Sequence, residues 1–231
     1  DGWVTRPAWQ QGFVWLLLLL VYYFAEWPWL LLLCAIVAAL GFLAQPRIGL
    51  ALALLVLPFY EFHKEFDWLG RHWQIPPTQA ILLCLLPAAW AYRPTSLKRD
   101  RWQGVALSWL AIMLLSAFGV WYWPAYRIGM MNLVITPLFL FFLIRTWATT
   151  RQHAHTLVFA LAAGGILIAG IGLIDWMQGR GTLADGMRRL TGLGYSSNHT
   201  ALYLIRTLAI AVGLMLAASR KTKWLRRTTL Q

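Results

Sequence analysis

The stretch Thr156–Ile174 reads TLVFALAAGGILIAGIGLI and contains no charged side chain. A helix needs about 20 apolar residues to cross the hydrocarbon core of a bilayer, which is about 30 Å thick. This stretch is therefore typical of a transmembrane helix. Small residues recur four positions apart within it, as Ala160 with Gly164 and Gly165 with Ala169, and such pairs let membrane helices approach closely.

Further apolar segments lie on both sides of this stretch in the 231-residue chain. The composition agrees with lipid as the solvent, because 60% of the residues are hydrophobic and 12% are charged, whereas a soluble domain has about 25% charged residues. The sequence thus predicts an all-α, polytopic membrane protein with about eight transmembrane helices in a single domain over 1–231. The first and third segments are short, so a re-entrant segment there would change the count. The other segments are Phe13–Phe24, Trp29–Leu43, Ile48–Tyr60, Pro76–Tyr92, Gly104–Val120, Ile128–Ile144 and Thr200–Ala218.

The distribution of Lys and Arg between alternate connections predicts the orientation, because cytoplasmic loops carry the excess of these residues. Both termini are therefore expected in the cytoplasm, and the connections Glu61–Gln74 and Asp175–Asn198 on the outer side, both as loops. The outer set is Lys64, Arg71, Arg127, Arg180, Arg188 and Arg189. The larger, cytoplasmic set is Arg6, Arg47, Arg93, Lys98, Arg99, Arg101, Arg145, Arg151, Arg220, Lys221, Lys223, Arg226 and Arg227.

The net charge of +12 does not indicate a nucleic-acid partner, because the basic residues form short clusters between apolar runs. Cys34 and Cys84 each lie inside an apolar run and are best explained as small packing residues. His153 and His155 have no third ligand nearby in the sequence. The sequence therefore predicts no metal site and no cofactor.

The connection before the last helix combines cations, glycines and a polar helix entrance. Arg180 and Arg189 offer forked donors that suit phosphate oxygens, and Asn198 is well placed to cap the helix that follows. A helix N-terminus with Arg nearby is an anion site. On the outer face of a bacterial inner membrane, lipid-linked pyrophosphates are the large anionic substrates.

Arg189, the Thr191-Gly192 pair and the run Asn198-His199-Thr200-Ala201 resemble the signature of the O-antigen ligase family. That family includes O-antigen polymerases and bacterial protein O-oligosaccharyltransferases. The spacing agrees from Arg189 through Gly192 to Asn198 and Ala201. The chain differs from the family pattern at Leu193-Gly194, where Thr-Phe is typical, and at Thr200, where an aromatic residue is common.

The resemblance implies a metal-independent glycosyltransferase that moves a glycan from undecaprenyl pyrophosphate to a lipid A-core sugar, a polysaccharide or a protein hydroxyl. Arg189 would be its catalytic residue, neutralising the pyrophosphate so that it leaves more readily. In the family, a further Arg and a His lie in a large periplasmic loop beyond this point. The chain stops at Gln231, so we expect it to be the N-terminal part of such a fold.

Other residues have both a functional and a simpler interpretation. Arg127 could join the same cationic site, and Arg206, inside the last segment, could hold a lipid phosphate, pair with Asp175 or Glu26, or reach back to the interface. His199 could exchange protons at periplasmic pH or be a plain interfacial side chain.

Two other classes of function stay open at this point. A multi-pass transporter or lipid flippase would use the few polar intramembrane residues, although the chain has no paired broken helices or repeat halves. A non-catalytic membrane subunit would need none of the arginines.

Overall fold

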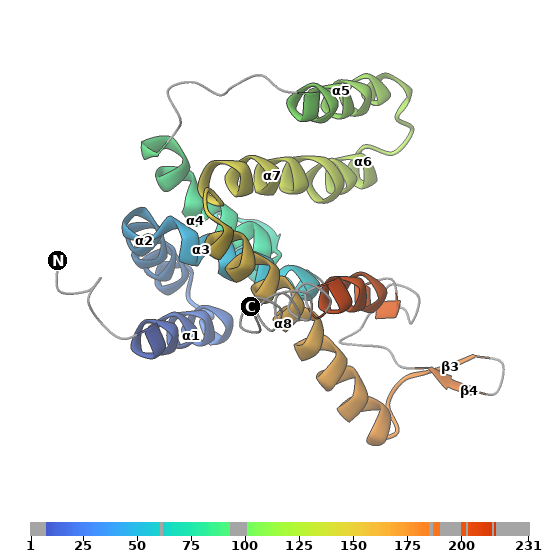
Figure 1. Cartoon of the computed structure of the whole chain (residues 1–231). Coiled ribbons are helices and arrows are strands. Elements are labelled where there is room, and N and C mark those ends of the chain that lie inside the picture. The colour runs from blue at the N-terminus through green and yellow to red at the C-terminus, as the bar shows by residue number, and fades with distance from the viewer. Residues whose placement is uncertain are drawn as a thin grey trace, which may run out of the picture. The chain divides into compact units, whose positions relative to one another are not determined.

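The computed structural model describes residues 8–60, 62–92, 101–184, 187–189, 200–201, 203–213 and 215. Helices dominate these residues, and Figure 1 shows them in chain order from blue to red. Contacts divide the chain into two compact units, of which the first is Asp1–Leu50, Lys64–Ile75 and Gln79–His153, and the second is Ala51–His63, Pro76–Thr78 and Ala154–Gln231.

Each of the apolar segments predicted from the sequence lies on a helix in the described part of the chain. Proline stands in the first turn of α2, α3, α4 and α6, where its missing N–H has no partner to lose. The last helix covers the described residues from Thr200 to Met215. The others are α1 Ala8–Phe24, α2 Pro28–Ala44, α3 Pro46–Leu55, α4 Pro77–Ala91, α5 Arg101–Leu115, α6 Trp123–Gly129, α7 Thr136–Trp147 and α8 Arg151–Met177. Short 3₁₀ turns, η1 Leu57–Phe59 and η2 Ser116–Gly119, follow α3 and α5, and a π-helical stretch, η3 Met130–Ile135, joins α6 to α7.

Three of the described helices are long and apolar enough to cross a membrane: Arg101–Gly119, Trp123–Trp147 and Arg151–Met177. The 27 residues of α8 extend about 40 Å at 1.5 Å per residue, more than the hydrocarbon thickness. By contrast, the 10 residues of α3 extend about 15 Å, which is half of that thickness. The long helices expose large apolar side chains, such as Phe118 at 92% and Ile112 at 61%. A surface of this kind is stable in lipid and costly in water.

The first unit has an apolar centre where α1 to α4 and η3 contribute side chains. Leu50 on α3 and Leu85 on α4 are fully buried, and Val134 of η3 is 1% exposed. Trp15 of α1 stacks on Phe42 of α2 with ring centroids 4.8 Å apart. One polar contact enters this packing, because Gln79 Nε2 donates to Asn132 Oδ1 at 2.7 Å.

The second unit packs α8 through its small residues. A methyl group at Gly164 would overlap the carbonyl oxygen of Leu55, and one at Gly165 would overlap the side chain of Thr207 on the last helix. Ala160 is buried as well, and Ala169 is half-buried. The prediction that these small residues form a helix-packing surface is confirmed.

The connection predicted as a loop over Glu61–Gln74 contains an antiparallel hairpin, so that prediction is wrong in detail. Its strands are β1 Lys64–Trp68 and β2 Arg71–Ile75. The two turn residues, Leu69 and Gly70, have φ of 53° and 70°. A two-residue turn with both φ values positive matches the twist of a hairpin.

Polar contacts join residues that the charge distribution had assigned to the same side of the membrane. Arg47 Nη1 lies 2.8 Å from His153 Nε2, so the start of α3 meets the start of α8 within the first unit. Lys64 Nζ donates to the carbonyl oxygen of Tyr23 at 2.7 Å, which joins the first hairpin to the end of α1. Which side of the bilayer each pair faces stays a prediction.

Candidate functional site

The candidate site begins where α8 ends. Gly179 has φ of 81°, the left-handed conformation that commonly follows a helix. The backbone N–H of Arg180 then turns back and donates to the Asp175 carbonyl at 2.8 Å. The Arg180 Nη1 atom also lies 3.4 Å from Asp175 Oδ1, with the arginine side chain 73% exposed and the aspartate side chain 25% exposed. The end of α8 therefore holds Arg180 beside a carboxylate at the surface.

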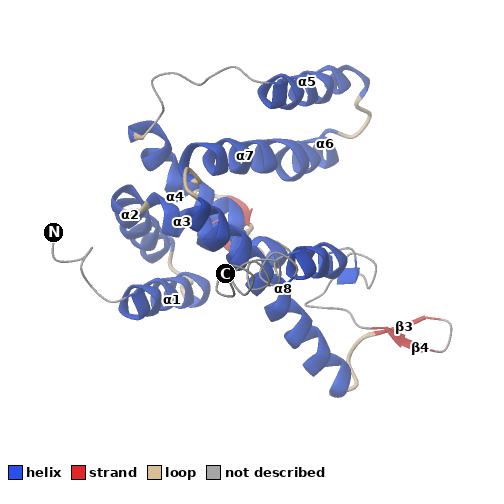
Figure 2. Cartoon of the chain, viewed as in Figure 1, coloured by secondary structure: helices blue, strands red, loops and turns tan. Residues whose placement is uncertain are grey.

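A second hairpin pairs Arg189 with the strand that follows Arg180. Strands β3 Thr182–Ala184 and β4 Met187–Arg189 pair antiparallel, with Thr182 opposite Arg189 (Figure 2). Directly opposed residues of an antiparallel pair lie about 4.5–5.5 Å apart at Cα. Arg189 is therefore at the base of the hairpin, across from a residue two positions after Arg180. Its side chain is exposed.

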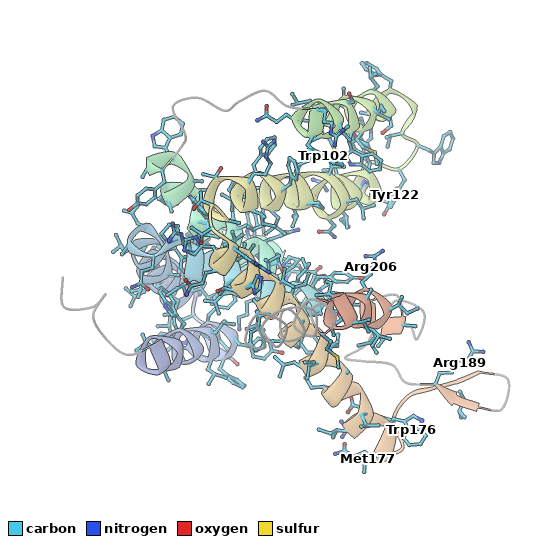
Figure 3. All side chains as sticks on the ribbon, in the orientation of Figure 1. Trp102, Tyr122, Trp176, Met177, Arg189 and Arg206 are labelled. Carbon is cyan, nitrogen blue, oxygen red and sulfur yellow. The ribbon has the colours of Figure 1, made fainter. Side chains whose placement is uncertain are left out.

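Large apolar side chains are exposed at the end of α8 and on the hairpin. Trp176 is 45% exposed and Met177 is 73% exposed in the last turn of α8, and Leu183 of β3 is 73% exposed (Figure 3). Indole rings and apolar side chains beside arginines are typical of a membrane–water interface. A ligand bound here would meet cations and an apolar surface together, which suits a phosphate attached to a lipid chain.

Arg206 is exposed on the last helix, and its neighbour Thr207 is buried against α8 (Figure 3). Successive helix residues point about 100° apart, so the packing of Thr207 turns Arg206 away from α8. Asp175, one of the two carboxylates predicted to pair with Arg206, forms its ion pair with Arg180. In the structure, the partner of Asp175 is therefore Arg180 and not Arg206.

The remaining predicted site residues are placed as follows. Arg127 is exposed on α6, in the first unit, whereas Arg180, Arg189 and Arg206 belong to the second. That Arg127 belongs to the same site as the other three arginines stays a prediction. Gly192, Asn198 and His199 lie outside the described residues, while Thr200, directly after them, is buried in the last helix. Among the described residues, no group of three His, Cys, Asp or Glu side chains could hold a metal.

Sequence reasoning missed the hairpin that joins Arg189 to the end of α8. A signal for it was present, because Asp185-Gly186 separates the two short strands. An Asp-Gly pair between strand-like residues is among the strongest hairpin signals. The role of Asp175 as the partner of Arg180 was missed as well, because the aspartate was considered only as a partner for Arg206.

The fold and this surface define a helical membrane protein in which Arg180 and Arg189 follow the longest apolar helix of the described residues. No family model matches the chain, and neither a curated protein nor a solved structure matches it.

Proposed function

We propose that the protein is a membrane glycosyltransferase of the O-antigen ligase type. Its donor is a glycan on undecaprenyl pyrophosphate, and its acceptor is a lipid A-core sugar, a polysaccharide or a protein hydroxyl. The resemblance of Arg189, Gly192 and Asn198 to that family motivates the proposal. The observation that supports it is the β3–β4 pairing, which sets Arg189 opposite Thr182, two positions after Arg180.

The proposed chemistry is displacement of a pyrophosphate. The acceptor hydroxyl attacks the anomeric carbon and loses its proton to water, a glycosidic bond forms, and the bond from that carbon to the pyrophosphate oxygen breaks. Arginine presents a planar fork of N–H donors that matches phosphate oxygens. Arg189 would stabilise the negative charge that grows on the leaving pyrophosphate, and Arg180 would add positive charge beside it. Asn198, His199 and Gly192 would contact the pyrophosphate or the glycan from the entrance of the last helix.

The proposal includes a topology. The chain would cross the bacterial inner membrane about eight times with both termini in the cytoplasm, and 175–199 would form a periplasmic motif loop. The Lys and Arg distribution supports this arrangement. The contacts of Arg47 with His153 and of Lys64 with Tyr23 agree with it, because each joins residues assigned to one side.

The experiment that tests the function is glycan transfer by the full-length protein with Arg189→Ala. Removal of a group that stabilises transition-state charge typically costs 10²–10³-fold in rate, so we expect a loss of about that size with accumulation of the lipid-linked donor. Arg188→Ala is the matched control, since it removes the same charge at the adjacent position, which is not part of the family motif. We expect that variant to retain most of its activity. Undiminished transfer by Arg189→Ala would rule out this residue as catalytic.

The same experiment separates the other two classes of function. A transporter or flippase would move a substrate across reconstituted vesicles without forming a glycosidic bond. A non-catalytic subunit would co-purify with an enzyme whose activity does not change when the arginines of this chain are replaced.

A further inference from the structure

The register of the first hairpin separates its side chains into two chemically different faces. Lys64 pairs with Ile75, Phe66 with Trp73, and Trp68 with Arg71, so the aromatic rings and both cations share one face. The opposite face carries Glu65 with Gln74 and Asp67 with His72.

The polar face is linked by its own side chains. His72 Nδ1 lies 2.9 Å from Asp67 Oδ1, and its Nε2 lies 3.9 Å from Glu65 Oε2. Gln74 Nε2 donates to Glu65 Oε1 at 3.0 Å. These hydrogen-bonded polar side chains favour contact with water. The two cations of the strands, Lys64 and Arg71, are on the opposite face.

Two contacts fix the hairpin at the corner between α1 and α2. Lys64 Nζ donates to the carbonyl oxygen of Tyr23 in the last turn of α1. Trp68 packs edge-on against Trp29 at the start of α2, with ring centroids 6.5 Å apart. The hairpin is thus attached where one apolar helix ends and the next begins.

This corner exposes an unusual amount of large apolar surface. Phe24, Trp27 and Trp29 are 73%, 76% and 72% exposed, and Trp73 of the hairpin is 43% exposed. Leu69 at the tip of the hairpin is 84% exposed. Leucines of α1 and α2 are exposed as well, such as Leu17 at 51% and Leu33 at 56%.

We propose that this hairpin and the α1–α2 corner bind the interface of the bilayer that surrounds the helices, with anionic phospholipid as the partner. Leu69 and Trp73 would enter the boundary between headgroups and acyl chains, where indole rings are favoured. Arg71, on the same face, would meet lipid phosphates, since a cation near an anionic membrane surface is attracted to it. The acidic face, with Glu65 and Asp67, would turn to water. This proposal does not depend on glycosyl transfer.

The test measures nitroxide accessibility in the whole chain reconstituted in vesicles, on a background in which Cys34 and Cys84 are replaced by Ala. Leu69→Cys places the label at the tip and Trp73→Cys on the apolar face, and Asp67→Cys and Gln74→Cys place it on the polar face. Trp73 and Gln74 are a matched pair, because they are adjacent in β2 and point to opposite sides. Collisions with oxygen report lipid, and collisions with an aqueous nickel chelate report water.

We expect the ratio of oxygen to nickel accessibility to be severalfold higher at 69 and 73 than at 67 and 74. The ratio at 69 should rise in vesicles that contain phosphatidylglycerol relative to pure phosphatidylcholine, and Arg71→Gln should remove that rise. Equal and high nickel accessibility at all four positions would overturn the proposal, as expected if the hairpin instead awaits a protein partner. A ratio at 69 that does not respond to phosphatidylglycerol would overturn the choice of anionic lipid. If Trp73→Cys does not fold, the comparison of 69 with 67 decides the result.

Discussion

Single glycines decide how closely α8 approaches its neighbours in the second unit. Gly164 lies against the backbone carbonyl of Leu55 and the ring of Pro58, and Gly165 lies against Thr207. Backbone cannot move aside as a flexible side chain does, so Gly164 is the less tolerant position. Gly170, on the same helix, has nothing within 4 Å of the place where a Cβ would stand.

Gly164→Ala should lower the free energy of unfolding in detergent or lipid by about 1–3 kcal/mol, because the added methyl group forces the two segments apart. Gly170→Ala is the control and should be neutral or slightly stabilising, since alanine is the better helix former. Equal stability of the two variants would show that α8 does not pack on Leu55 as described.

At the scale of elements, a hydrogen bond joins α4 to the π-helical stretch η3. Gln79 Nε2 donates to Asn132 Oδ1, and Asn132 lies within Met130–Ile135. Two amide side chains in apolar helices are stable only when each finds a polar partner. The bond therefore fixes which face of the long Trp123–Trp147 helix meets α4.

A double-mutant cycle on Gln79→Ala and Asn132→Ala should give a coupling free energy of about 0.6 kcal/mol, with about 1.7 kcal/mol as the upper limit for such bonds in membrane proteins. As the control, a second cycle combines Leu83→Ala with Asn132→Ala. Leu83 is an exposed residue of α4, so the effects of these two changes should be additive. Additivity of the Gln79 and Asn132 changes would contradict a direct bond between them.

Across the whole molecule, the positions of the helices could be predicted because apolar content is a local property of the chain. The ends of the helices were predicted less accurately than their positions. Both α5 and α8 begin at an arginine, Arg101 and Arg151, earlier than the apolar runs suggested, since a helix can continue past the hydrocarbon into water. The first hairpin was missed because its turn is Leu69-Gly70, and leucine rarely adopts a positive φ.

The candidate site was only partly predictable for a similar reason. Residue type and motif selected Arg180 and Arg189, but strand pairing decides that Arg189 lies opposite Thr182, in the strand that follows Arg180. The pairing of Asp175 with Arg180 depends on the turn after α8, where Gly179 adopts a positive φ. The division into two compact units could not be foreseen either, because it depends on contacts between distant segments.

The side of the membrane that the β3–β4 hairpin faces is the most direct test of the proposed function, because lipid-linked pyrophosphate donors are used on the outer face. A cysteine at Leu183, which is 73% exposed in β3, can be probed with a membrane-impermeant maleimide on a background without Cys34 and Cys84. A cysteine at Thr149, exposed between α7 and α8, is the control for the predicted cytoplasmic side. We expect Leu183→Cys to react in cells with an intact inner membrane and Thr149→Cys to react only after permeabilisation. Labelling of Leu183→Cys only after permeabilisation would put the arginines in the cytoplasm and contradict the proposed enzyme.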